Sequence, residues 1–171
     1  MVYGTGYTGS LIIDLALRRK LVPNKDSLIL GARNREQASK VAKKFGLLSG
    51  TETPREFGEK VRVFALDAAA DPAAIAPYLE DIFLVIHTAG PFSKTARPML
   101  LACIRTRTHY IDITGEIEVF EFCRSMDAEA KKANILAVSG VGCDVVPTDC
   151  LAVRFDERKG DGQTESKELQ K

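Results

Sequence analysis

Two kinds of apolar pattern alternate along this sequence. Short, continuous apolar runs typical of buried strands are separated by stretches in which apolar residues recur at helical spacing. Apolar strands that alternate with helices favour a parallel sheet covered on both faces, because each parallel connection needs a crossover. Right-handed crossovers then predict a doubly wound α/β fold with about six strands.

The predicted elements follow from that alternation. We expect strands at residues 1–3, 27–30, 61–66, 82–86, 110–113 and 135–138. We expect helices over about 8–20, 36–45, 71–78, 98–104 and 116–133, and a loop over 49–59. We expect one domain over 1–155, followed by a tail over 156–171. Charged residues predominate in that tail and Leu169 is its one large apolar side chain, so we expect disorder there, with a surface helix as the alternative.

Length, charge and cysteine content exclude several classes of protein. A chain of 171 residues suffices for one domain that buries about 70% of its unfolded surface. A formal net charge of +1 gives no reason to expect nucleic acid as a partner. The sequence contains no apolar run near the roughly 18 residues of a membrane span, and its start does not resemble a signal peptide. With two histidines, four cysteines and no C-x-x-C pair, we expect no metal site and a cytoplasmic or other reducing compartment.

A glycine-rich turn lies between the first strand and the first helix. Its residues are Gly4-Thr5-Gly6-Tyr7-Thr8-Gly9, in the spacing G-x-G-x-x-G. This spacing alone is weak evidence, but here it opens a strand–helix–strand unit of about 30 residues, the context that a dinucleotide site requires. We expect Gly4 to permit the turn, Gly6 to admit the pyrophosphate and Gly9 to let the helix pack on the strand. The amides of Tyr7 and Thr8, at the helix N-terminus, would face the phosphates.

The residue after the second strand indicates which dinucleotide is bound. NAD sites place an acid roughly 20 residues beyond the turn, and the sequence has Arg33 there instead. A guanidinium can bind the 2′-phosphate of NADP, so NADP(H) is predicted over NAD, with Arg35 as a possible second donor. The alternative is that Arg33 is a solvated residue at a strand end.

Two further loops follow predicted strands at the same edge of the sheet. Asp67 is placed to accept a hydrogen bond from the adenine amino group, or to cap the next helix. Ala89-Gly90-Pro91 follows the fourth strand, where small residues would let the ribose and nicotinamide pass close to the backbone. His87, just before them, is interpreted as a strand-end histidine rather than a proton donor.

Three longer segments carry a resemblance to a known family. They are His87-Thr88-Ala89-Gly90-Pro91-Phe92, then residues 109–116 (HYIDITGE), then residues 140–150 (GVGCDVVPTDC). Together with the motifs at 6–9 and 30–33, they resemble the saccharopine dehydrogenase-like oxidoreductases, a group that includes the trans-acting enoyl reductases. The resemblance covers Met1 to about Leu151.

The resemblance implies an NAD(P)-binding Rossmann domain at the front of a longer oxidoreductase. In the reductases of that family, hydride passes from NADPH to an unsaturated, lipid-linked acyl group; in true saccharopine dehydrogenases the chemistry is at a carbon–nitrogen bond. Members usually have more residues before the turn and continue into a domain that shapes the substrate site and commonly the dimer. We therefore expect a shortened form with the cofactor half present and the substrate half absent.

Two functions remain open from the sequence. One is hydride transfer from NADPH to an enoyl or imine substrate; the other is a truncated, non-catalytic module that binds cofactor or a partner. His109, Asp112 and Glu116 are the titratable groups expected nearest the nicotinamide. They lack the spacing of an acid–base pair, and Asp112 and Glu116 fit strand-end and helix-start roles, so no catalytic residue is assigned. Exposed apolar surface makes a homo-oligomer an open possibility.

Overall fold

The computed structural model describes residues 1–22, 27–47 and 63–156. Three predictions fall wholly or partly outside these ranges: the loop at 49–59, the first two residues of the strand at 61–66, and all but the first residue of the tail.

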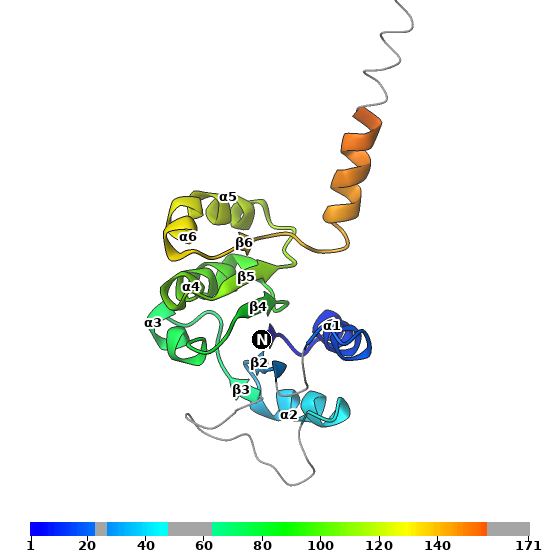
Figure 1. Ribbon diagram of the computed structural model, residues 1–171, viewed down its shortest axis with the longest axis vertical. Helices are drawn as coiled ribbons and strands as arrows, with labels where there is room; N and C mark the ends of the chain where they lie inside the picture. The colour runs from blue at the N-terminus through cyan, green and yellow to red at the C-terminus, as the bar shows by residue number, and fades with distance from the viewer. Residues whose placement is uncertain (23–26, 48–62, 157–171) are drawn as a thin grey trace, which may run out of the picture.

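The described residues form one parallel sheet of six strands (Figure 1). The strands are β1 (Val2–Tyr3), β2 (Leu30–Ala32), β3 (Val63–Ala65), β4 (Leu84–His87), β5 (His109–Asp112) and β6 (Ala137–Val138). Their order in space is β3-β2-β1-β4-β5-β6, and every neighbouring pair is parallel. The order reverses between β1 and β4, which confirms the predicted doubly wound fold and defines its switch point.

Helices cover the two faces of the sheet (Figure 1). They are α1 (Tyr7–Arg18), α2 (Arg35–Lys44), α3 (Pro72–Ile75) with the 3₁₀ turn η2 (Ala76–Tyr78), α4 (Phe92–Thr106), α5 (Ile117–Ser125) and α6 (Asp127–Ala133). Successive strand residues point to opposite faces, so Val2 packs with the residues of α1 and α2 while Tyr3 packs with those of α3 and α4. Two apolar cores result, one on each face.

Two helices differ from their predicted bounds. Helix α4 begins at Phe92 and not near Pro98, which lies inside the helix. The single helix predicted over 116–133 is two helices, because the chain leaves helical geometry at Met126 (φ −92°, ψ 11°). Met126 is partly buried and packs against the core, so the break falls where the chain turns a side chain inward.

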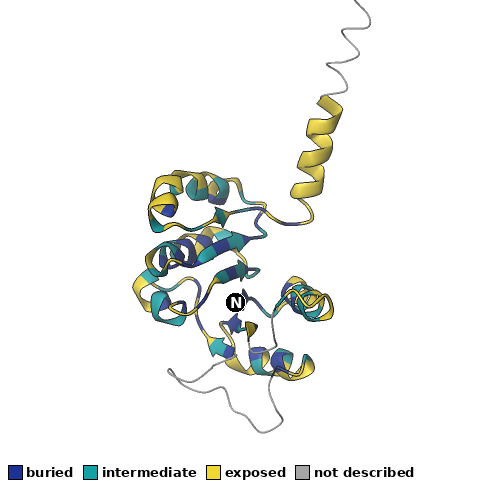
Figure 2. Ribbon diagram, in the orientation of Figure 1, coloured by how far each residue is buried: buried dark blue, intermediate teal, exposed yellow. Residues whose placement is uncertain are grey.

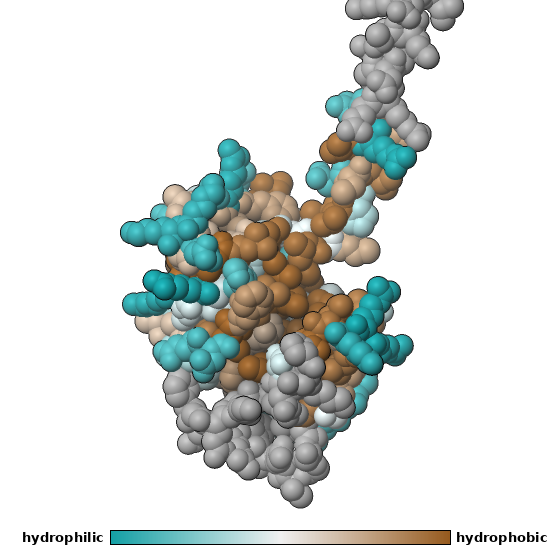
Figure 3. Space-filling model, viewed as in Figure 1, coloured by the Kyte–Doolittle hydropathy of each residue, from teal (hydrophilic) through white to brown (hydrophobic). Residues whose placement is uncertain are grey.

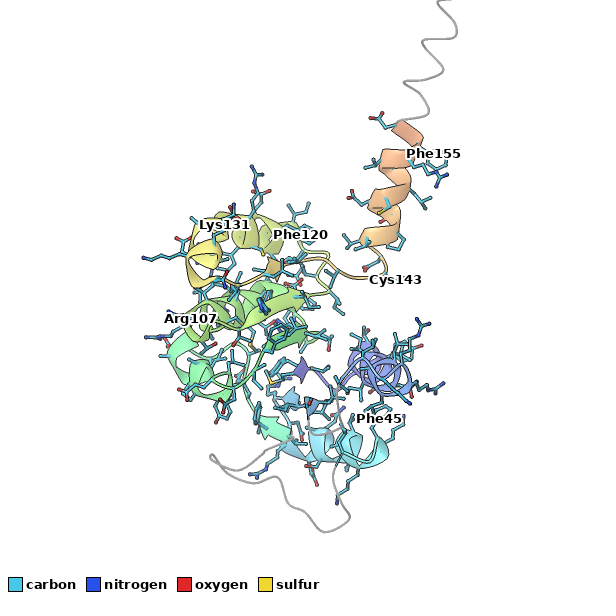
Figure 4. The ribbon with its side chains drawn as sticks, viewed as in Figure 1. Phe45, Arg107, Phe120, Lys131, Cys143 and Phe155 are labelled. Atoms are coloured by element: carbon cyan, nitrogen blue, oxygen red, sulfur yellow. The ribbon has the colours of Figure 1, made fainter. Side chains whose placement is uncertain are left out.

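A helix over residues 146–156, which the sequence pattern did not predict, extends away from the sheet (Figure 1). Every one of its residues is exposed (Figure 2). Its large apolar side chains are 46–62% exposed; they are Val146, Leu151, Val153 and Phe155. Cys143 lies just before the helix and Phe155 near its far end (Figure 4).

Candidate functional site

The glycine turn joins β1 to α1 at the carboxyl edge of the sheet. Gly4 has a φ of +124°, a conformation that side chains disfavour, and its N–H donates to the carbonyl of Gly31 at 2.8 Å. A Cβ on Gly9 would overlap the carbonyl oxygen of Gly4. Among the described residues, a Cβ on Gly6 would meet nothing within 4 Å. Gly4 and Gly9 therefore serve the fold of the turn, whereas Gly6 borders open space.

Helix α1 begins beside that open space without a cap. Gly6 is its N-cap residue, no side chain of the described residues caps it, and its first turn carries no acid. The first N–H groups of a helix have no intrahelical partner and carry partial positive charge. Tyr7 and Thr8, both exposed, lie in this first turn, and Thr5 is half-buried before it. The arrangement suits an anion such as a phosphate.

Arg33 and Asp67 follow the neighbouring strands β2 and β3 at the same edge. Arg33 is exposed and makes no hydrogen bond or ion pair within the described ranges. Asp67 is exposed, and its Oδ1 accepts a hydrogen bond from the Ala69 N–H at 3.0 Å. The N-cap of α3 is Asp71, which accepts from the Ala73 N–H at 2.7 Å. The alternative that Asp67 caps the next helix is therefore wrong.

The loop after β4 borders the glycine turn at the switch point. The N–H and hydroxyl of Thr88 both donate to the carbonyl of Tyr3, at 2.7 and 3.0 Å, so the ends of β1 and β4 are joined. Beyond it, Ala89 is half-buried, while Gly90 and Pro91 are exposed. Because the strands are parallel, this loop, the glycine turn, Arg33 and Asp67 all lie along one edge.

Glu116 caps α4 from another element. Its Oε1 accepts from the Phe92 N–H at 2.8 Å and its Oε2 from the Ser93 N–H at 2.7 Å. Partial desolvation raises the pKa of this carboxyl, but these hydrogen bonds outweigh it and hold the pKa below its ordinary value. Glu116 therefore fixes the start of α4 beside the exposed loop after β4.

A buried polar network lies inside the same end of β4, β5 and β6. The Asp112 carboxylate is fully buried and accepts four hydrogen bonds. Its donors are the Tyr110 hydroxyl (2.8 Å), the Ser139 hydroxyl (2.9 Å), and the Thr114 and Gly140 N–H groups (3.0 Å each). This one carboxylate thus joins the loops after β5 and β6.

His87 extends the network to β4. Its Nδ1 lies 3.2 Å from the Tyr110 hydroxyl, which already donates to Asp112, so His87 is the donor in this pair. Burial lowers the pKa of His87 to about 4 against the opposing effects of Asp112 and the Ala89 backbone. Its Nε2 is buried without a hydrogen-bond partner in the described part of the chain. Burial, followed by the Asp112 charge, raises the pKa of Tyr110 well above its ordinary value.

His109 lies at the opposite edge of the sheet. It is the first residue of β5 and pairs with Leu84, the first residue of β4, whereas Asp112 pairs with His87 at the other end. Its Nδ1 accepts from the Leu136 N–H at 2.9 Å. The expectation that His109 lies near the nicotinamide is wrong, because His109 begins β5, whereas the glycine turn and the loop after β4 follow the carboxyl ends of their strands.

Comparison with known proteins decides the family. The model of the saccharopine dehydrogenase NADP binding domain matches residues 1–138. The chain belongs to this family. NADP is the cofactor of the matched domain, and the open space at Gly6 beside the uncapped start of α1 fits its pyrophosphate.

The relatives that this chain matches are longer proteins. A human saccharopine dehydrogenase-like oxidoreductase is 26% identical over 95% of this chain and 38% of its own length. A trans-acting enoyl reductase from Mycobacterium leprae is 30% identical over 87% of this chain and 33% of its own length. Apo saccharopine dehydrogenase (L-Glu forming) from Saccharomyces cerevisiae has the same fold, with a TM-score of 0.65 at 21% identity over 92% of this chain and 30% of its own. The chain thus spans about a third of each.

Among the described residues, no helix combines the length and the apolar character needed to cross a membrane. Within the same residues, no group of three or more His, Cys, Asp or Glu side chains is arranged to hold a metal ion.

Proposed function

We propose that the carboxyl edge of this domain holds NADP(H) for hydride transfer to an enoyl or imine substrate. The observation that carries the proposal is the glycine turn, where Gly6 leaves open space beside an uncapped helix start. The NADP-binding family domain and the named enoyl reductase and saccharopine dehydrogenase relatives support it.

Each loop at this edge has a proposed role. The Tyr7 and Thr8 amides bind the pyrophosphate, and Arg33 binds the 2′-phosphate. Asp67 accepts from the adenine amino group through the carboxylate oxygen that its own turn leaves free. The loop Ala89-Gly90-Pro91 lies along the ribose and nicotinamide.

Bound NADPH supplies the hydride, and the protein supplies its orientation. The buried Asp112 carboxylate and the partly exposed Glu116 carboxylate hold the loops on the nicotinamide side. We assign no proton donor, because Asp112 is enclosed by its four donors and Glu116 is engaged by α4.

A second candidate is a cofactor-binding module that acts through a partner surface without turnover. Full exposure of the helix over 146–156 favours it. Apolar side chains also gather over the strand ends between α1 and that helix (Figure 3). Both observations support a homo-oligomer or another covering chain.

The four free cysteines support a reducing compartment. This is the cytoplasm or another compartment, such as the mitochondrion named for a plant relative.

The test of cofactor choice is titration of the purified chain with NADPH, NADP, NADH and NAD.

Replacing Arg33 with Ala removes a charged hydrogen-bond donor. NADP affinity should therefore fall roughly 10- to 100-fold, while NAD affinity changes less than about twofold. Arg124→Ala is the matched control, because Arg124 is an exposed arginine on α5. Absence of binding by all four at millimolar concentration would refute the site, and equal loss for NADP and NAD would remove the role of Arg33. Binding of NADPH without oxidation by any enoyl-thioester or imine acceptor would favour the module.

A further inference from the structure

The side chain of Tyr3 reaches from the central strand β1 to the loop after β3. Its hydroxyl donates to the Leu66 carbonyl at 2.5 Å and accepts from the Ala68 N–H at 3.0 Å. Tyr3 is 2% exposed, so neither backbone group has water as an alternative partner. One hydroxyl thus fixes the residues on both sides of Asp67.

The path of the Tyr3 ring depends on its neighbours on both sides. A Cβ on Gly31, in β2, would lie 2.7 Å from Cδ2 of Tyr3, so the ring crosses β2 where that strand has no side chain. The His87 ring packs edge-on against the other side, with centroids 5.3 Å apart. The ring is therefore packed between β2 and His87, and it holds the loop after β3 from the middle of the sheet.

The charged groups beside the Tyr3 hydroxyl, Asp67 and Arg33, are those proposed to contact the cofactor. Burial raises the pKa of the Tyr3 phenol, Asp67 raises it further, and the Ala68 N–H and Arg33 oppose them. Asp67 and Arg33 are therefore both within electrostatic reach of the Tyr3 hydroxyl. Backbone pairing brings them together, because the Leu66 N–H donates to the Ala32 carbonyl at 2.9 Å.

We propose that Tyr3 is a positioning residue for the adenosine half of NADP. It holds the loop 66–68 so that Asp67 lies beside Arg33 at the ligand edge. This inference rests on the proposed cofactor site and adds a residue that touches no ligand itself. Removing its hydroxyl should harm recognition of one half of the dinucleotide and spare the other.

The experiment compares Tyr3→Phe with Tyr110→Phe. Both variants lose one buried phenol hydroxyl, but from opposite halves of the sheet. Each folded variant is titrated with adenosine 2′,5′-bisphosphate and with nicotinamide mononucleotide, using NMR shifts to follow weak binding. Tyr3→Phe should lower affinity for the bisphosphate about tenfold, the equivalent of about one misplaced hydrogen bond. It should change mononucleotide affinity less than about twofold, and Tyr110→Phe should leave bisphosphate affinity unchanged.

Each other outcome has a definite meaning. Equal loss for both fragments in Tyr3→Phe would indicate general destabilisation and overturn the positioning role, as would unaltered bisphosphate affinity. Failure of the unaltered chain to bind NADPH would instead refute the proposed function. If Tyr3→Phe does not fold, the unaltered chain provides the test. The bisphosphate should then shift the Ala68 and Ala69 amide signals while the mononucleotide should not, and absence of a shift would overturn the inference.

Discussion

The two halves of the sheet position their loops by different means. In the half made of β1, β2 and β3, the glycine turn and β2 depend on close approaches at glycines, and one tyrosine hydroxyl holds the loop after β3. In the other half, β4 and β5 are four residues long and end in buried polar side chains. Asp112 there accepts hydrogen bonds from its own strand and from the loops after β5 and β6.

This difference separates two kinds of sensitivity. The first half tolerates no added volume at particular glycines, because the obstructing atom is the Gly4 carbonyl oxygen at Gly9 and the packed Tyr3 ring at Gly31. The second half tolerates no loss of a hydrogen-bond acceptor, because buried N–H groups then have no partner. Steric substitutions and polar substitutions should therefore test the comparison independently.

The largest expected effect is that of Gly9→Ala. The added Cβ would overlap the Gly4 carbonyl oxygen, so α1 must move off the turn. We expect a loss of about 4 kcal/mol in the free energy of unfolding, above the usual cost of overpacking, measured by urea denaturation.

Gly6→Ala is the matched control for that substitution. Its Cβ meets open space among the described residues, so stability should change by about 1 kcal/mol or less. NADP affinity should nevertheless fall about tenfold or more, since the methyl group obstructs the pyrophosphate. Equal destabilisation by the two substitutions would break the distinction between a folding glycine and a ligand glycine.

Asp112→Ala should have the next largest effect, about 3 to 4 kcal/mol. It leaves two backbone N–H groups and two hydroxyls without their acceptor in a fully buried site.

Asp112→Asn separates the effect of the negative charge from that of the hydrogen-bond acceptors. The amide oxygen can still accept from the Thr114 and Gly140 N–H groups, and the Tyr110 and Ser139 hydroxyls can rotate to accept from the amide nitrogen. We expect a loss of about 1 to 2 kcal/mol by urea denaturation. If Asn is as harmful as Ala, the negative charge matters more than the number of acceptors.

Local patterns explain why much of the fold could be predicted. The glycine spacing, the apolar strands and the helical periodicity each depend on residues close in sequence. Together they predicted the parallel sheet, the carboxyl ends of its strands as the ligand side, and the cofactor. Strand bounds shifted by one to three residues: the second strand was predicted at 27–30 and lies at Leu30–Ala32. Leu28 is buried but precedes the paired segment, and burial alone does not reveal pairing.

Long-range contacts explain what could not be predicted. The start of α4 at Phe92 is fixed by Glu116, 24 residues further along the chain, so Pro98 was a misleading signal. Tyr3 and Leu66 are 63 residues apart, and Ser139 reaches Asp112 over 27. A tyrosine in an apolar strand signals burial, but its hydroxyl's partner depends on which strands become neighbours.

An effect smaller than those of Gly9→Ala and Asp112→Ala should appear in the pH dependence of stability. His87 has a pKa of about 4 in the fold and 6.5 as its ordinary value, so the unfolded chain binds more protons between these pH values. The stability that comes from keeping His87 neutral should therefore be fully present above pH 6.5 and should decline as the pH falls toward 4. At about 1.4 kcal/mol per pH unit, the loss is about 3 kcal/mol. Urea denaturation at several pH values measures this loss.

His87→Gln lacks the titrating ring and should flatten the dependence of the free energy of unfolding on pH. Glu116 adds a further loss of stability at lower pH in both proteins. An unchanged slope in His87→Gln would mean that the acid sensitivity of the second half does not pass through His87.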